Sequence, residues 1–144
     1  MISNRSVPAD ILLPHVVYRD VASAAAWLKT AFGFEEAYRY GNPAQGVLMR
    51  FGQAWVMLTI ARPGRSTPAQ CGAWTQMLTL FVEDVDAHYS RVKSAGARIV
   101  EELNETGYGE RQFAAEDLDG HRWLFSRHAR DVSPKEWGAS VLKE

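Results

Sequence analysis

The chain has 144 residues, of which 47% are hydrophobic and 23% charged, and its formal net charge is −1. A chain of this length buries about two-thirds of its unfolded surface, so it needs no metal or disulfide to be stable. The near-neutral charge excludes a basic nucleic-acid footprint and a polybasic membrane anchor. The single cysteine, Cys71, excludes an internal disulfide and a zinc site built from cysteines.

The first predicted elements are a strand, a helix and three further strands. β-branched residues favour a strand over residues 11–18, and Asp20 is a suitable N-cap for the helix that follows. Apolar residues then repeat at helical spacing on one face, at Val21, Ala24, Ala25, Leu28 and Phe32. Gly33 fits the left-handed position that ends a helix. The remaining strands are predicted at residues 34–40, 46–51 and 54–61, with a tight turn at Gly52 and Gln53.

The second half of the chain repeats this pattern at an offset of 64 positions, which aligns VVYRDV at residues 16–21 with LFVEDV at residues 80–85. A strand is predicted at 77–83, and Asp84 caps a helix whose inner face is Val85, Tyr89, Val92 and Ala95. Further strands are predicted at residues 97–102, 111–116 and 121–128. Asp119 and Gly120 are typical of the hairpin turn between the last two. Each half is therefore a predicted βαβββ unit.

Two loops and a tail lie outside the repeats, which cover about residues 11–61 and 76–128. The loops at 62–75 and 103–110 are too short to separate independent domains, so we expect one domain over residues 1–144. In the tail, from residue 129 onward, residues 133–136 (SPKE) predict the start of a short helix that presents Trp137 and Val141 on one side. This tail docks either on its own chain or on a partner subunit.

The tandem βαβββ pattern resembles the vicinal oxygen chelate superfamily, which includes glyoxalase I, extradiol dioxygenases, methylmalonyl-CoA epimerase and the bleomycin-resistance proteins. Residues 117–123 (DLDGHRW) resemble the Asp-Pro-X-Gly-(His/Asn) hairpin of that family, with Leu118 where proline is usual. The segments most similar to its PhnB-like branch are PHVV at 14–17, AFGF at 31–34 and DVSPKE at 131–136. The resemblance implies an α+β fold in which tandem βαβββ units form a half-open mixed β-sheet groove with flanking helices.

The metal enzymes of this superfamily place one ligand, a His, Gln or Glu, on the first and on the last strand of each half. Counting back seven positions from Asp20 places Leu13 at the first position, and the repeat offset places Met77 at its mate. The last-strand positions fall on Met57 and Leu124. Leucine has no lone pair, and a thioether suits zinc, magnesium, manganese or iron(II) poorly. We therefore expect neither a metal nor another cofactor.

Two alternatives to a metal-free site stay open. A copper(I) site of His15, Met57 and Met77 is conceivable, although apolar packing of two methionines is far commoner. A register shift of two positions would bring His15 or Ser126 to a ligand position without completing a ligand set.

Side chains alternate along each strand, so one face packs the helices and the other lines the groove. The residues predicted to line the groove and bind a ligand are Leu13, His15, Trp55, Met57, Thr59, Met77, Thr79, Phe81, Arg122, Leu124 and Ser126. The opposite parity is uniformly apolar and comprises Val16, Val56, Leu58, Leu78, Leu80, Val82, Trp123 and Phe125. A face that mixes aromatic residues with a few polar groups is typical of a ligand pocket.

These features predict a metal-free homodimer that sequesters an aromatic or amphipathic small molecule, without catalytic residues. An alternative is an enzyme of the same superfamily, either a divergent metal-dependent lyase or dioxygenase or a metal-independent catalyst that uses His15 with Arg122. In a third interpretation the groove is mostly subunit interface. Residues 1–10 contain Pro8 and no apolar core, and the longest apolar run, residues 54–61, is too short to span a bilayer. We therefore expect a cytoplasmic protein without nucleic-acid or membrane partners.

Several of these side chains have simpler structural interpretations. Arg122 follows a turn, where pairing with Asp117 or Glu116 would account for it. Trp74 and Tyr108 lie on loops near the ends of the groove, where they either cover the pocket or fill a subunit interface.

The remaining histidines and the adjacent carboxylates give little indication of chemistry. His121 and His128 lie near strand ends, where exposure is expected. Glu35 and Glu36 are neighbours on a strand and point in opposite directions, so they cannot form a carboxylate dyad.

Overall fold

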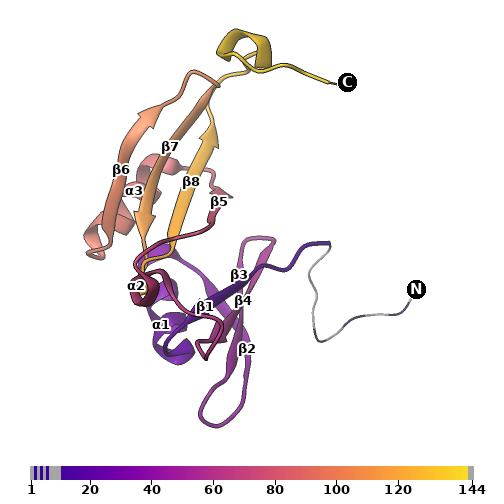
Figure 1. Ribbon diagram of the computed structural model, residues 1–144. Helices are drawn as coiled ribbons and strands as arrows, with labels where there is room; N and C mark the ends of the chain where they lie inside the picture. The colour runs from indigo at the N-terminus through magenta and orange to yellow at the C-terminus, as the bar shows by residue number, and fades with distance from the viewer. Residues whose placement is uncertain (1, 3, 5, 7–10, 143–144) are drawn as a thin grey trace. The chain divides into compact units, whose positions relative to one another are not determined.

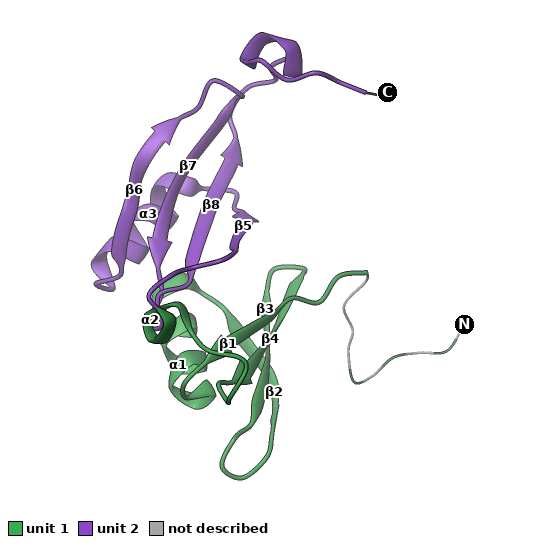
Figure 2. Cartoon of the chain, in the orientation of Figure 1, with its two compact units in different colours: residues 1–71 green, residues 72–144 purple. Residues whose placement is uncertain are grey.

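The computed structural model describes residues 2, 4, 6 and 11–142, and it is α+β with two βαβββ-like units (Figure 1). The first unit is formed by residues 1–71 and the second by residues 72–144 (Figure 2). Each unit has one open, mixed sheet of four strands with a helix packed on it. No helix among the described residues is long and apolar enough to cross a membrane.

The sheet of the first unit has the strand order β1-β4-β3-β2. Its elements are β1 (His15–Tyr18), α1 (Val21–Phe32), β2 (Glu35–Tyr40), β3 (Gly46–Phe51) and β4 (Ala54–Ile60). β1 runs parallel to β4, whereas β2, β3 and β4 pair antiparallel. The predicted turn at Gly52 and Gln53 is confirmed as the β3–β4 connection.

Helix α1 begins and ends at the predicted residues. The Asp20 carboxylate accepts hydrogen bonds of 3.0 and 3.1 Å from the backbone N–H groups of Ala22 and Ser23. Gly33 has a φ of +89° and ends the helix in the left-handed conformation that a side chain would disfavour. The buried face contains the five predicted residues together with Ala31, and it packs on β2, β3 and β4.

The second unit repeats this topology with the strand order β5-β8-β7-β6. Its elements are β5 (Met77–Phe81), α3 (Val85–Ser94), β6 (Arg98–Glu105), β7 (Glu110–Glu116) and β8 (Arg122–His128). Asp84 caps α3 by accepting a 3.0 Å hydrogen bond from the N–H of Ala87. Val85 and Val92 are buried as predicted, but Ala95 is exposed because α3 ends at Ser94, so its place on the inner face is wrong.

The predicted apolar face forms the core of each sheet. Val16, Val56 and Leu58 are buried in the first unit, and Leu80, Trp123 and Phe125 are buried in the second. Leu78 and Val82 are half-buried, at and just beyond the edge strand β5. The alternation of side chains therefore predicted correctly which face of each sheet packs against its helix.

The hairpin between β7 and β8 is built around Asp117. Its Oδ1 accepts hydrogen bonds of 3.0 Å from the backbone N–H groups of Asp119 and His121. The predicted Asp-Gly turn is confirmed with Leu118 in the usual proline position. The expected exposure of His121 is wrong, because this turn holds the residue against Asp117 and buries it.

Several boundaries differ from the predictions. β1 begins at His15 and not at residue 11, β5 ends at Phe81 and not at residue 83, and β6 extends into the predicted loop as far as Glu105, which pairs with Arg111 of β7. The loop at 62–75 contains a short helix, α2 (Pro68–Cys71). Thr67 and Gln70 cap it reciprocally, since each side-chain oxygen accepts the backbone N–H of the other residue. This Thr-Pro-Ala-Gln signal was readable in the sequence.

The tail contacts the turn between β6 and β7 of its own unit. The backbone N–H groups of Ala129 and Arg130 donate to the carbonyl oxygen of Gly109, at 2.8 and 3.1 Å. The tail then forms a 3-10 helix (Pro134–Trp137), whose predicted start is confirmed. The ring of Trp137 lies 5.6 Å from that of Tyr108, which supports docking of the tail on its own chain.

Candidate functional site

Strand register places the predicted site residues of the first unit on one face of its sheet. His15 lies opposite Met57, and Thr59 lies two positions further along β4 on the same face, as does Trp55 in the other direction. Leu13 precedes β1, but the neighbouring Pro14 carbonyl accepts a 2.9 Å hydrogen bond from the N–H of Met57, which continues the strand pairing. This face is opposite to the one that packs on α1.

Exposure differs strongly among these residues. Met57 and Thr59 are only 6% and 5% exposed, whereas Trp55 and Leu13 are half-buried and His15 is exposed. Among the predicted residues of this face, the accessible ones are therefore Trp55, Leu13 and His15.

The second unit brings its predicted site residues together in the same way. Met77 lies opposite Arg122, Thr79 opposite Leu124, and Phe81 opposite Ser126. Met77 and Phe81 are 43% and 69% exposed, so β5 presents apolar side chains on the open face. The hydroxyl-bearing Ser126 is buried beside them.

The expected metal-ligand positions are structurally equivalent in the two units. Met57 lies opposite His15, and Leu124 lies opposite Thr79, which is the residue 64 positions after His15. Leu13 lies two positions before His15, and Met77 lies two positions before Thr79. Leu13 with Met57 and Met77 with Leu124 are therefore equivalent diagonal pairs. Leucine and thioether side chains do not fit a zinc, manganese or iron(II) site, and the described residues contain no cluster of three His, Cys, Asp or Glu side chains able to hold a metal. Met57 and Met77 of the alternative copper(I) site belong to different units.

A carboxylate on the open face of the second unit had no signal in the sequence. Glu110 of β7 accepts a 3.0 Å hydrogen bond from the Ser126 hydroxyl, and its other oxygen lies 3.0 Å from Nδ1 of His128. The Ser126 hydroxyl donates its hydrogen bond to the carboxylate of Glu110 and not to the imidazole of His128. These three residues therefore lack the serine–histidine hydrogen bond that activates a serine nucleophile. It provides a polar anchor beside Phe81. Only the β7–β8 register, with Glu110 opposite His128, could have suggested it.

This polar cluster continues across the sheet to β6. The Tyr108 hydroxyl donates to Oε1 of Gln112 at 3.3 Å, and Nε2 of Gln112 donates to Glu101 at 3.4 Å. Asn104 donates a further 3.1 Å hydrogen bond to the Glu101 carboxylate. On the open face of the second unit, β5 thus presents Met77 and Phe81, while the hydrogen-bonded polar side chains lie on β6, β7 and the end of β8.

Arg122 lies between a carboxylate and an aromatic ring. Its Nη2 is 3.2 Å from Oε1 of Glu116, which confirms the simpler pairing proposed for it. Its guanidinium carbon is 4.9 Å from the centroid of the Trp74 ring. Arg98 of β6 reaches the other Glu116 oxygen at 3.3 Å. Trp74 therefore covers a predicted ligand-binding residue of its own unit.

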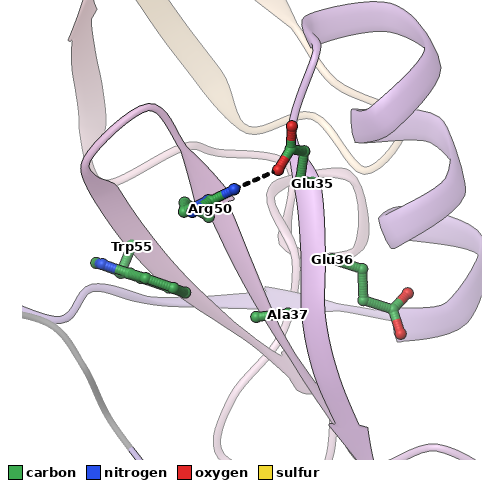
Figure 3. A pocket seen from close by; sticks show the side chains of 5 residues that line it. All are labelled: Glu35, Glu36, Ala37, Arg50 and Trp55. Carbon is green, nitrogen blue, oxygen red and sulfur yellow. Dashed lines mark hydrogen bonds and ion pairs between the residues drawn. The ribbon is translucent and has the colours of Figure 1, made fainter.

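A cavity of about 240 Å³ lies on the first unit, and Figure 3 shows the side chains that line it. These residues are Glu35, Glu36, Ala37, Arg50 and Trp55. Nη2 of Arg50 is 2.5 Å from Oε2 of Glu35, and the guanidinium carbon lies 5.9 Å from the centre of the Trp55 ring system. Trp55 was predicted to bind a ligand, whereas the contribution of Arg50 and Glu35 follows from their register on β3 and β2.

The second carboxylate of this cavity is held by a separate ion pair. Glu36 points away from Glu35 (Figure 3) and accepts two hydrogen bonds of 2.7 Å from the guanidinium of Arg39. The hydrogen bond from Arg39 lowers the pKa of Glu36, so this side chain is ionised at neutral pH. The prediction that Glu35 and Glu36 form no carboxylate dyad is confirmed.

Comparison with known proteins gives consistent relatives. Residues 11–125 match the model of the Glyoxalase/Bleomycin resistance protein/Dioxygenase superfamily. Uncharacterized proteins of Mycobacterium bovis and Mycobacterium tuberculosis are each 33% identical over 92% of this chain, which corresponds to 93% and 83% of their own lengths. The crystal structure of TioX from Micromonospora sp. ML1 has a TM-score of 0.70 and 32% identity, covering 81% of this chain and 97% of TioX. A glyoxalase/bleomycin resistance protein/dioxygenase family enzyme from Burkholderia phytofirmans PsJN has a TM-score of 0.67 at 18% identity, covering 83% and 99%.

Proposed function

Because the chain belongs to the Glyoxalase/Bleomycin resistance protein/Dioxygenase superfamily, we propose that it is a metal-free protein that binds an aromatic or amphipathic small molecule on its open sheet faces. One observation carries this proposal. The equivalent diagonal pairs Leu13 and Met57, and Met77 and Leu124, occupy the expected metal-ligand positions, and neither pair suits a hard or borderline cation. The chemistry that remains on these faces is aromatic contact and hydrogen bonding.

The second unit offers both halves of an amphipathic binding surface. Phe81 supplies exposed aromatic area next to Ser126, whose hydroxyl is held by Glu110. Burial of about 200 Å² of apolar ligand surface stabilises a complex by roughly 5 kcal/mol before the cost of association. Polar contacts to this cluster must therefore contribute to an affinity useful in a cell, which favours a ligand with both an apolar ring and hydrogen-bonding groups.

We include in this proposal that the protein is a homodimer. Met77 and Phe81 leave the apolar edge strand of the second unit exposed, and a second copy of the chain would remove this surface from water. Sedimentation velocity across a hundredfold concentration range tests this point. A protein that sediments as a monomer at all concentrations would contradict it.

The experiment that tests binding combines two measurements on protein purified without chelator. Elemental analysis is expected to find far less than one zinc, nickel, manganese or iron atom per chain. Titration with a panel of aromatic compounds is expected to quench or shift tryptophan emission, because Trp55 and Trp74 both border open faces. Stoichiometric metal would instead support the enzyme alternative, and a silent panel would support an open face that serves only as an interface.

A further inference from the structure

The cavity beside Trp55 combines the aromatic surface of the indole with the guanidinium of Arg50, most of whose hydrogen-bond donors have no acceptor in the described residues. Among the residues that the structure describes, Glu35 is the only hydrogen-bond partner of the Arg50 guanidinium, and it engages one terminal nitrogen. A guanidinium carries five N–H donors in a planar fork, so most of them are available to a second acceptor. The side chain of Arg50 is 46% exposed, and this fork is therefore accessible from solvent.

The order of Trp55, Arg50 and Glu35 along the cavity (Figure 3) determines which group a bound ligand meets first. Arg50 lies between Glu35 and Trp55 (Figure 3). A planar group stacked on the half-buried indole of Trp55 would therefore place its substituents next to the guanidinium before reaching the carboxylate. Glu35 is already neutralised by Arg50, and Glu36 by Arg39, so neither presents an uncompensated charge to a cationic ligand.

The second unit contains a similar arrangement of an aromatic ring, a guanidinium and a carboxylate. There, the Trp74 ring lies on the guanidinium of Arg122, which is paired with the carboxylate of Glu116. Each unit thus assembles a ring, a guanidinium and a carboxylate from its own side chains. In the first unit, the guanidinium of Arg50 contacts its carboxylate and its indole, yet a cavity of about 240 Å³ is left beside them.

We propose that this cavity binds a planar aromatic carboxylic acid, with its ring on Trp55 and its carboxylate on the free N–H donors of Arg50. Glu35 positions the guanidinium fork by holding one of its nitrogens. The proposal rests on the proposed function and specifies the class of ligand for the first unit. The cavity is smaller than the usual range of about 300–1,000 Å³ for drug-sized ligands, which indicates an acid of one or two rings.

The test uses the full chain labelled with ¹⁵N and three probes: 2-naphthoate, its neutral analogue 2-naphthamide, and cyclohexanecarboxylate, which has no aromatic ring. The shift of the Trp55 indole N–H signal, assigned by its loss in Trp55→Leu, reports binding at this site. We expect 2-naphthoate to bind roughly tenfold more tightly than 2-naphthamide, as one charge-assisted hydrogen-bonded pair would give. Cyclohexanecarboxylate is expected to bind at least tenfold more weakly than 2-naphthoate.

Variants of Arg50 distinguish recognition by the planar guanidinium from simple attraction by a positive charge. Arg50→Gln is expected to abolish the preference for the acid while retaining weak binding of both naphthyl compounds. Arg50→Lys, which keeps the charge but loses the fork, is expected to retain only part of the preference. Arg62→Gln makes the same charge change at an exposed residue of the first unit outside the cavity lining, and it is expected to leave the preference unchanged. Circular dichroism of each variant confirms that it is folded.

Two results would overturn this inference. In the first, the amide binds Trp55 as tightly as the acid, or Arg50→Gln leaves the preference intact; aromatic binding and the proposed function would then stand without the acid site. In the second, naphthyl probes shift other indole signals but not that of Trp55, which would place binding elsewhere. Failure of the proposed function itself would appear as silence of all indole signals towards the wider aromatic panel.

Discussion

The carboxylate of Asp117 accepts a 3.0 Å hydrogen bond from the indole Nε1–H of Trp123, a side chain that is itself buried in the core of the second unit. The other oxygen of Asp117 accepts the two backbone N–H groups that form the β7–β8 turn. One buried carboxylate therefore joins the turn to the core. This explains why the hairpin forms with leucine in place of the usual proline.

Substitution of Asp117 by alanine is expected to lower the free energy of unfolding by about 3 kcal/mol or more. The change leaves the indole N–H of Trp123 and two turn N–H groups without their acceptor, and each loss of this kind costs about 1–3 kcal/mol. Urea denaturation measures the effect. The control is Asp86→Asn, which removes a carboxylate from an exposed ion pair with Arg111 and should lower stability far less than Asp117→Ala. Equal losses in the two variants would contradict this role of Asp117.

Gly109 is expected to tolerate no side chain. It has a φ of +92°, and a Cβ at this position would lie 2.1 Å from the backbone carbonyl oxygen of Arg130. Gly109→Ala must therefore displace the tail from the β6–β7 turn as well as strain the backbone. We expect a loss of about 3 kcal/mol, compared with about 1 kcal/mol for Gly96→Ala, which has a similar φ but open space around it. Thermal unfolding of both variants provides the measurement, and similar melting temperatures would argue against close packing of the tail.

His88 is expected to make stability depend on pH. Burial against Phe113 and Phe125, with the nearby charge of Arg91 as a smaller cause, lowers the pKa of His88 from 6.5 to about 4. Between these two values the unfolded chain binds a proton at His88 that the folded chain does not. The contribution of His88 to the free energy of unfolding therefore falls as the pH falls and levels off below about pH 4. Since the ring is only half-buried, we expect its contribution to be about 1–2 kcal/mol.

A comparison of histidine variants tests this pH dependence. His88→Phe keeps an aromatic ring in contact with Phe125 and is expected to flatten the stability profile between pH 6.5 and 4.5. The matched control, His15→Asn, removes an exposed ring and is expected to keep the wild-type slope. If His88→Phe and the wild type lose stability in parallel over this range, the acid sensitivity arises from other groups.

Chelator treatment is expected to leave stability unchanged. A metal present at a thousandfold excess over its dissociation constant would stabilise the folded chain by about 4 kcal/mol, which corresponds to several degrees in melting temperature. With Leu13, Met57, Met77 and Leu124 at the expected ligand positions, we predict a shift of less than about 1 °C on addition of EDTA. A fall of several degrees that zinc or nickel reverses would contradict the metal-free proposal.

Much of the fold was predictable because its determinants are local. The caps at Asp20 and Asp84 and the left-handed Gly33 depend on neighbouring residues, and side-chain alternation separates the two faces of each sheet without knowledge of the strand order. The repeat offset then aligned Leu13 with Met77. Boundaries were less accurate where pairing with another strand decides them, as at Glu105, whose extension of β6 depends on its partner Arg111.

The sequence by itself determined the βαβββ repeat, which can be read from residue types and short spacings. Together with the family resemblance, it also placed Leu and Met at the expected metal-ligand positions. Only the tertiary structure decided which side chains meet across strands. The cluster of Glu110 with Ser126 and the cavity between Arg50 and Trp55 depend on strand register. Register is set by pairing between distant segments and by irregularities such as the one between Glu36 and Tyr38. No local pattern encodes such contacts, because each strand taken alone is compatible with several registers.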